Sequence, residues 1–137
     1  MPQMPVATPS TPREKSRGPV LIVDDHAELR QAMTYALEAF GYQVVTAADG
    51  NEALDCIRRG TLPSLIVLDL DMPRRDGWAF RSEQARDPKL AAIPTIISSA
   101  ETSPMQKAAA PGIAGYFSKG DGIDALLDLV ERYCLRN

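Results

Sequence analysis

The hydrophobic residues of this chain follow two patterns that alternate along its length. Short runs of consecutive apolar residues are typical of strands buried on both faces of a parallel sheet. Apolar residues spaced three and four apart are typical of helices that pack one face on a core. The short runs predict five strands, at residues 20–23, 43–46, 65–68, 94–98 and 115–118.

Helical spacing predicts a helix after each strand, at residues 26–40, 51–59, 78–86, 105–110 and 123–134. The helix at 105–110 is short because Pro111 must end or kink it. Strands separated by helices form right-handed crossover units and a parallel sheet. The pattern therefore predicts an α/β fold of the flavodoxin-like doubly wound type, with five strands in the order 2-1-3-4-5 and five helices.

Three aspartates stand at the carboxyl ends of two predicted strands. Asp24 and Asp25 follow the first strand, and Asp69 follows the third. The predicted order places these strands side by side, at the edge where doubly wound sheets bind ligands. Crowded carboxylates repel one another unless they share a proton or a cation, and their hard oxygens suit Mg²⁺ or Mn²⁺. A helix-capping role is the alternative, but it would account for one of the three carboxylates.

Two further polar residues end at the same predicted edge. Ser99 follows the fourth strand and Lys119 follows the fifth. Taken singly, each has an ordinary interpretation, as a serine at a helix start and a solvated lysine. A hydroxyl and an ammonium beside carboxylates that bind a metal would provide a place for phosphoryl oxygens.

Composition and charge narrow the function classes. Residues 1–19 hold five of the eleven prolines and few bulky apolar residues, which predicts a disordered arm before a domain at 20–137. The net charge is −3; three basic residues against one acid give the arm +2, which leaves −5 on the domain. An acidic domain makes nucleic acid an unlikely partner for this chain alone. The location follows from three absences in the sequence. No apolar run approaches the ~18 residues of a membrane span. No signal-peptide pattern appears, and Cys56 and Cys134 lack metal-site spacing. We therefore expect a cytoplasmic protein.

The motifs together resemble the receiver domain of two-component response regulators. The resemblance covers about residues 19–136, nearly the whole predicted domain. The matching residues are Asp24-Asp25, Asp69, Met72-Pro73, Asp76-Gly77, Ser99-Ala100 and Tyr116-Phe117-Ser118-Lys119.

The resemblance implies a function in a phosphorelay. Asp69 would accept a phosphoryl group from a sensor histidine kinase or a histidine phosphotransfer protein. The chemistry would be limited to self-phosphorylation and self-dephosphorylation, so the chain would not be an enzyme in the usual sense. Asp71 and Glu101 would influence the lifetime of the phosphoryl group.

The resemblance also implies a set of site residues. Asp25, Asp69 and the backbone carbonyl of Asp71 would bind Mg²⁺, with Mn²⁺ as an alternative, and Asp24 would act directly or through water. The phosphoryl oxygens would be bound by Lys119, by the Ser99 hydroxyl and by the backbone at Ala100 and Leu70. Ser99 and Tyr116 would switch conformation with the phosphoryl group.

Output is less constrained by the sequence. We expect a monomer that signals to a downstream protein through the face around residues 100–120. Gly120 stands where the family usually has proline, which predicts a looser loop there. If residue 137 is the natural end, the receiver stands alone; if the chain is a fragment, an output domain follows it.

Two other functions are compatible with parts of the pattern. Asp69-Leu70-Asp71 resembles the start of haloacid-dehalogenase-type phosphatases, which would make the chain a phosphohydrolase. Those enzymes carry their acidic pair downstream, whereas here it lies upstream. A scaffold receiver that is never phosphorylated is the third possibility, and the complete acidic triad with Ser99 and Lys119 argues against it.

Overall fold

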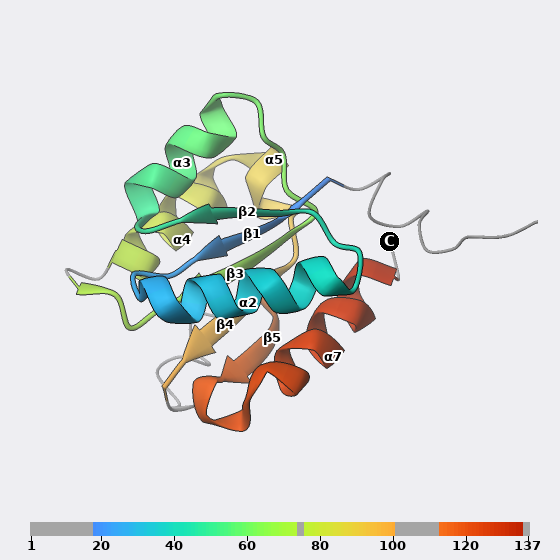
Figure 1. Ribbon diagram of the computed structural model, residues 1–137. Helices are drawn as coiled ribbons and strands as arrows, with labels where there is room; N and C mark the ends of the chain where they lie inside the picture. Colours follow the sequence, from blue (N-terminus) through green and yellow to red (C-terminus); the bar gives the residue numbers. More distant parts are fainter. Residues whose placement is uncertain (1–17, 74–75, 101–112, 136–137) are drawn as a thin grey trace, which may run out of the picture.

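A parallel sheet of five strands forms the centre of the molecule (Figure 1). The structure is a computed structural model, and it describes residues 18–73, 76–100 and 113–135. The strand order is β2-β1-β3-β4-β5, which confirms the predicted fold class. The strands are β1 (Val20–Val23), β2 (Val44–Ala47), β3 (Leu65–Asp69), β4 (Thr95–Ser99) and β5 (Ile113–Ser118).

Helices cover both faces of the sheet (Figure 1). Helices α2 (Ala27–Ala39) and α7 (Ile123–Leu135) lie on one face, and α3 (Gly50–Arg58), α4 (Asp76–Arg86) and α5 (Pro88–Ala91) lie on the other. A short 3₁₀ turn, η2 (Lys119–Asp121), joins β5 to α7. The helix predicted at 105–110 and the arm at 1–17 lie outside the described residues. Within the described residues, no helix has both the length and the apolar character needed to span a bilayer.

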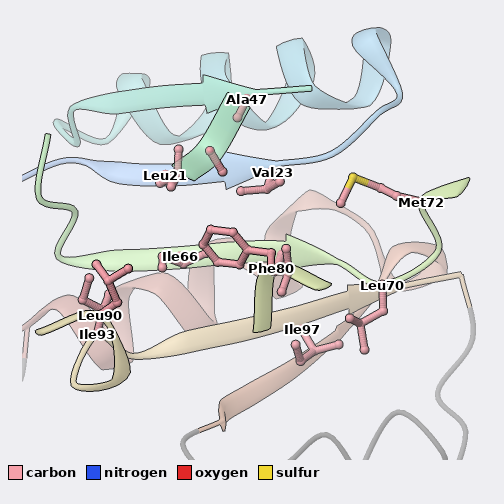
Figure 2. Close-up of a cluster of buried hydrophobic side chains, with 12 residues drawn as sticks. Leu21, Val23, Ala47, Ile66, Leu70, Met72, Phe80, Leu90, Ile93 and Ile97 are labelled. Carbon is pink, nitrogen blue, oxygen red and sulfur yellow. The ribbon is translucent and has the colours of Figure 1, made fainter. Parts of the chain in front are cut away.

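Alternate residues of the strands point to opposite faces and build two cores. The α2–α7 core contains Val20 and Ile22 of β1 together with Leu126 and Val130 of α7. The α3–α4 core, drawn in Figure 2, takes the intervening β1 residues. It is made of Leu21, Val23, Ala47, Ala53, Ile66, Leu68, Leu70, Met72, Phe80, Leu90, Ile93 and Ile97.

Helix α5 is an element that the sequence pattern did not predict. Helix α4 ends at Arg86, as predicted, and Pro88 then begins a new helix. Proline is well suited to the first turn of a helix because the missing N–H would have no partner there. The Asp87 side chain caps this helix by accepting a hydrogen bond from the Lys89 amide (3.0 Å).

A buried glutamine ties α4 to α5 and to the start of β4. The Gln84 side chain is 0% exposed. Its Nε2 donates to the Thr95 hydroxyl (2.9 Å) and to the Leu90 carbonyl (3.0 Å), and its Oε1 accepts from Arg81 (2.6 Å). Because buried amides need such partners, this network fixes how α4 sits on the sheet.

The limits of β1 match the prediction, and those of the other four strands differ from it by one or two residues. Strands β2 and β4 begin one residue later than predicted, and β5 begins at Ile113 rather than at Gly115. Proline has no N–H to give to a ladder. Pro94 therefore contributes only its carbonyl, which accepts from the Ile66 amide (3.0 Å).

Candidate functional site

Parallel pairing brings the predicted aspartates to one edge of the sheet. Val23 of β1 lies opposite Leu68 of β3, so Asp24 and Asp69, the next residue on each strand, emerge together. Both are buried, with 1% and 0% exposure. The Asp25 side chain is 34% exposed. Asp24, Asp25, Asp69 and His26 each offer a ligand atom, and these four atoms lie within 4.8 Å of one another.

Lys119 faces the two buried carboxylates from the opposite side of β3. Its Nζ lies 3.1 Å from Asp69 Oδ2 and 3.4 Å from Asp24 Oδ2. Neither oxygen accepts a well-formed hydrogen bond from any described group. One ammonium against three ionised carboxylates leaves two negative charges. This net negative charge suits a divalent cation, and so do the two buried Oδ2 atoms, which share the single ammonium of Lys119.

The other oxygen of each buried carboxylate is held by its own loop. Asp24 Oδ1 accepts from the His26 amide (2.8 Å), and Asp69 Oδ1 accepts from the Asp71 amide (2.8 Å). His26 is the N-cap residue of α2, and its side chain makes no capping bond. Asp24 therefore orders the turn before α2 and does not cap the helix, so the capping alternative does not account for it.

Burial raises the pKa of Asp69 to about 6, and the nearby charge of Asp24 adds to this rise. The amide of Asp71 and the ammonium of Lys119 act in the opposite direction. Burial by itself would lower the pKa of Lys119, but the charges of Asp69 and Asp24 outweigh it and hold that pKa above its ordinary value. At neutral pH the lysine is therefore charged and Asp69 is mostly ionised.

The residues at the end of β4 make an unexpected contact across the site. The Ser99 hydroxyl lies 3.2 and 3.3 Å from the two carboxylate oxygens of Asp71, and the Ala100 amide donates to Asp71 Oδ2 (2.7 Å). These are two of the four groups predicted to bind phosphoryl oxygens. In this structure an anion of the chain itself, the Asp71 carboxylate, bridges them.

Residues 20–131 match the family model of the response regulator receiver domain. The chain belongs to this family. Among solved structures, chemotaxis protein CheY4 of Vibrio cholerae is 32% identical, with a TM-score of 0.77 over 85% of this chain and 98% of that one. Response regulator TrrA of Thermotoga maritima, solved in complex with Mg(2+)-BeF, is 26% identical, with a TM-score of 0.73 over 85% of this chain and 98% of that one.

Receiver domains are signalling domains and not classical enzymes. They interact with histidine kinases or phosphotransfer proteins and with downstream targets. The probable transcriptional regulator ycf27 of Porphyridium aerugineum is 41% identical over 68 residues, which make up 50% of this chain but only 28% of that protein. The chain thus spans under a third of the length of this relative.

The loop after Asp69 is anchored beneath the receiver site by two buried side chains. Leu70 and Met72 are 6% and 4% exposed and pack into the α3–α4 core (Figure 2). The Leu70 amide, predicted to bind the phosphoryl group, donates to the Ser98 carbonyl (3.1 Å) and so extends the β3–β4 ladder. Its role at the phosphoryl group stays a prediction.

Gly77 explains why this loop can pass so close to α4. A Cβ at this position would lie 2.5 Å from the Asp69 carbonyl oxygen and 3.1 Å from Leu70 Cα. Both are backbone atoms, so a side chain at 77 would displace the loop that carries Asp69. The first turn of α4 therefore requires glycine here.

The remaining predicted residues lie on β5, within η2 or outside the described part. Tyr116 lies on β5, half-buried against the α3–α4 core. Gly120 lies within η2, where an added Cβ would lie 4.0 Å from Ser118 Oγ, and the looser loop expected there stays a prediction. Glu101 lies outside the described residues. The switch role of Tyr116 and the lifetime role of Glu101 stay predictions.

His26 is the site residue that the sequence pattern did not single out. Its side chain is 69% exposed, and its Nδ1 lies 3.6 Å from Asp24 Oδ1 and 3.5 Å from Asp25 Oδ1. A histidine directly after two aspartates is a recognisable signal, since imidazole is a common metal ligand. His26 lines a surface cleft of about 650 Å³ together with Asp25, Glu28, Asp71, Ala100 and Lys119.

Proposed function

We propose that Asp69 is the phosphoacceptor of this receiver domain, in a two-component phosphorelay. The supporting observation is the environment of its carboxylate. Asp69 is buried at the end of β3, 3.1 Å from the Lys119 ammonium and beside the cleft that His26 and Asp71 line. A sensor histidine kinase or a histidine phosphotransfer protein is the donor.

The residues fit the requirements of phosphoryl transfer. One Asp69 carboxylate oxygen attacks phosphorus in line, an acyl phosphate bond forms, and the phosphorus–nitrogen bond of the donor histidine breaks. The transition state spreads negative charge over the equatorial oxygens, and positioned cations stabilise it. The Lys119 ammonium supplies one such charge. The Ser99 hydroxyl and the Ala100 amide supply neutral donors once Asp71 releases them.

The acidic cluster would hold Mg²⁺, with Mn²⁺ as an alternative. Asp25, Asp69 and the Asp71 carbonyl would bind the ion, and Asp24 would bind it directly or through water. The ion would neutralise charge on the phosphoryl oxygens. Support comes from the net negative charge and from two buried carboxylate oxygens, one each on Asp24 and Asp69, that share the single ammonium of Lys119. The complex of TrrA with Mg(2+)-BeF is consistent with this assignment.

Signalling leaves the domain through the face around residues 100–120, with Ser99 and Tyr116 coupling the phosphoryl group to it. Part of this face, residues 101–112, lies outside the described residues. We assign the arm to residues 1–19 and the receiver domain to 20–137. The domain acts in the cytoplasm as a monomer that contacts a downstream protein.

Incubation with acetyl phosphate and Mg²⁺, followed by intact mass measurement, tests the assignment. The wild type should gain one phosphoryl group only when Mg²⁺ is present, and Asp69→Asn should gain none. Asp128→Asn, which removes an exposed carboxylate from α7, is the matched control and should react like the wild type. A modified Asp69→Asn protein would overturn the assignment, and an unmodified wild type would favour the scaffold alternative.

A further inference from the structure

The imidazole of His26 lies where a ligand of the cation site would lie. The turn that fixes Asp24 also fixes this residue, because Asp24 Oδ1 accepts the His26 amide hydrogen (2.8 Å). The Nδ1 atom then lies between the two neighbouring carboxylates, at 3.6 Å from Asp24 Oδ1 and 3.5 Å from Asp25 Oδ1.

These separations suit a shared ion. Ligand atoms at about 2.1 Å from a six-coordinate metal are roughly 3.0 Å apart when adjacent and roughly 4.2 Å apart when opposite. The four ligand atoms of Asp24, Asp25, His26 and Asp69 lie within 4.8 Å of one another. Small side-chain rotations would bring the set onto one ion. Asp25 and His26 are free to make them, since their side chains are 34% and 69% exposed.

We propose that His26 is a metal ligand of this receiver, and that it makes the site a mixed nitrogen and oxygen site selective for borderline transition-metal ions such as Zn²⁺, Ni²⁺ and Co²⁺. The inference rests on the proposed cation site and names a second class of ion, besides Mg²⁺, that His26 lets this site bind. Carboxylate, carbonyl and water suit Mg²⁺, whereas imidazole suits Zn²⁺ and Ni²⁺. Replacing one water by imidazole therefore favours the latter class.

His26 itself adds affinity for transition-metal ions, beyond the affinity that the carboxylates provide. Transition-metal ions bind most sites more tightly than Mg²⁺ does, so tight Zn²⁺ binding alone would not identify a histidine ligand. The chain contains one histidine. Any imidazole signal that responds to a metal therefore comes from His26.

Two measurements on the full chain, at about pH 8, test the proposal. The first is nitrogen NMR with ¹⁵N-labelled histidine. Zn²⁺ should shift the Nδ1 resonance strongly at one equivalent, whereas Mg²⁺ should leave the pattern of a free imidazole. An Nδ1 resonance that Zn²⁺ does not move would overturn the proposal.

The second measurement is calorimetric titration with Ni²⁺ and with Mg²⁺. His26→Gln should weaken Ni²⁺ binding about tenfold or more and change Mg²⁺ binding less than about twofold, in line with the loss of one ligand. Glu28→Gln is the matched control, because Glu28 lines the same cleft without belonging to the ligand set, and both affinities should stay near the wild-type values. Equal losses of both ions in His26→Gln, or none, would show that His26 is not a selective ligand.

The outcomes separate this inference from the proposed function. A chain that binds Mg²⁺ and is phosphorylated on Asp69, but whose imidazole ignores Zn²⁺, refutes the His26 ligand alone. A chain that binds no divalent cation and is not phosphorylated refutes both.

Discussion

Replacing Asp71 by alanine should make the phosphoryl site easier to fill. In the structure the Asp71 carboxylate accepts from the Ala100 amide (2.7 Å) and lies 3.2 Å from the Ser99 hydroxyl. A bound phosphoryl group would need the same two donors. The resident carboxylate therefore competes with the incoming anion, and its negative charge repels that anion as well.

The size of the effect follows from these contacts. Hydrogen bonds to a charged group are worth about 1.5–3 kcal/mol each when well shielded. Asp71 and Ala100 are exposed, so hydrogen bonds to water replace much of the free energy that is lost when the contact opens. A net cost of about 1–2 kcal/mol for opening the bridge corresponds to a factor of roughly 5–30 in apparent affinity for a phosphoryl analogue.

Beryllium fluoride titration at saturating Mg²⁺ measures this affinity. Trp78 is a suitable fluorescence probe because it is half-buried in the first turns of α4, directly after the site loop. Asp71→Ala should bind beryllium fluoride about 5–30 times more tightly than the wild type. Alanine keeps the backbone carbonyl proposed to bind the metal, and Asp128→Asn controls for the change in net charge.

An equal or weaker affinity for beryllium fluoride in Asp71→Ala would refute the idea that Asp71 competes with the phosphoryl group for the Ser99 hydroxyl and the Ala100 amide. A tighter affinity also in Asp128→Asn would assign the gain to net charge and not to the bridge. The same variant should change the dephosphorylation rate several-fold, because the Asp71 carboxylate, which lines the cleft beside the site, is then absent and can neither orient nor repel the attacking water.

Three further predictions concern stability and the loop. The pKa of buried Asp69 is raised to about 6, so its ionisation lowers the free energy of unfolding of the metal-free protein as the pH rises from about 4 to 6. Asp69→Asn should therefore stabilise the fold by about 2–3 kcal/mol at pH 7.5 and by little at pH 4. Equal shifts of the urea midpoint at the two pH values would contradict this. Gly77→Ala should displace the Asp69 carbonyl and weaken Mg²⁺ binding about tenfold in calorimetry, whereas Gly120→Ala should bind normally. Gln84→Leu should cost about 2–4 kcal/mol in urea unfolding, against about 0.5 for exposed Gln31→Leu.

The sheet was predictable because its signal is local and strong. Each central strand is a run of consecutive apolar residues, and in a parallel sheet such runs leave few alternatives. Once the order 2-1-3-4-5 is fixed, the convergence of Asp24 and Asp69 follows from where the runs end. Lys119 follows in the same way from the end of β5.

Loop side chains were not predictable from spacing in the same way. The reach of Asp71 to Ser99 and Ala100 depends on the path of the loop after β3, which Leu70 and Met72 set by packing into the core. Helix α5 was missed because proline either ends a helix or begins one, and neighbouring caps decide which.

The carboxylates that are proposed to carry the chemistry of this site also destabilise the metal-free fold. Burying Asp24 and Asp69 side by side against a single ammonium is unfavourable for the metal-free fold, because desolvation and mutual repulsion both act on the carboxylates. The same excess negative charge is what gives a divalent cation and a phosphoryl group, bound together, their advantage. Contacts elsewhere offset this desolvation and repulsion, in the two hydrophobic cores that pack on both faces of β1 and β3. We therefore expect substitutions at the carboxylates to raise metal-free stability while abolishing function, and substitutions in the cores to lower both.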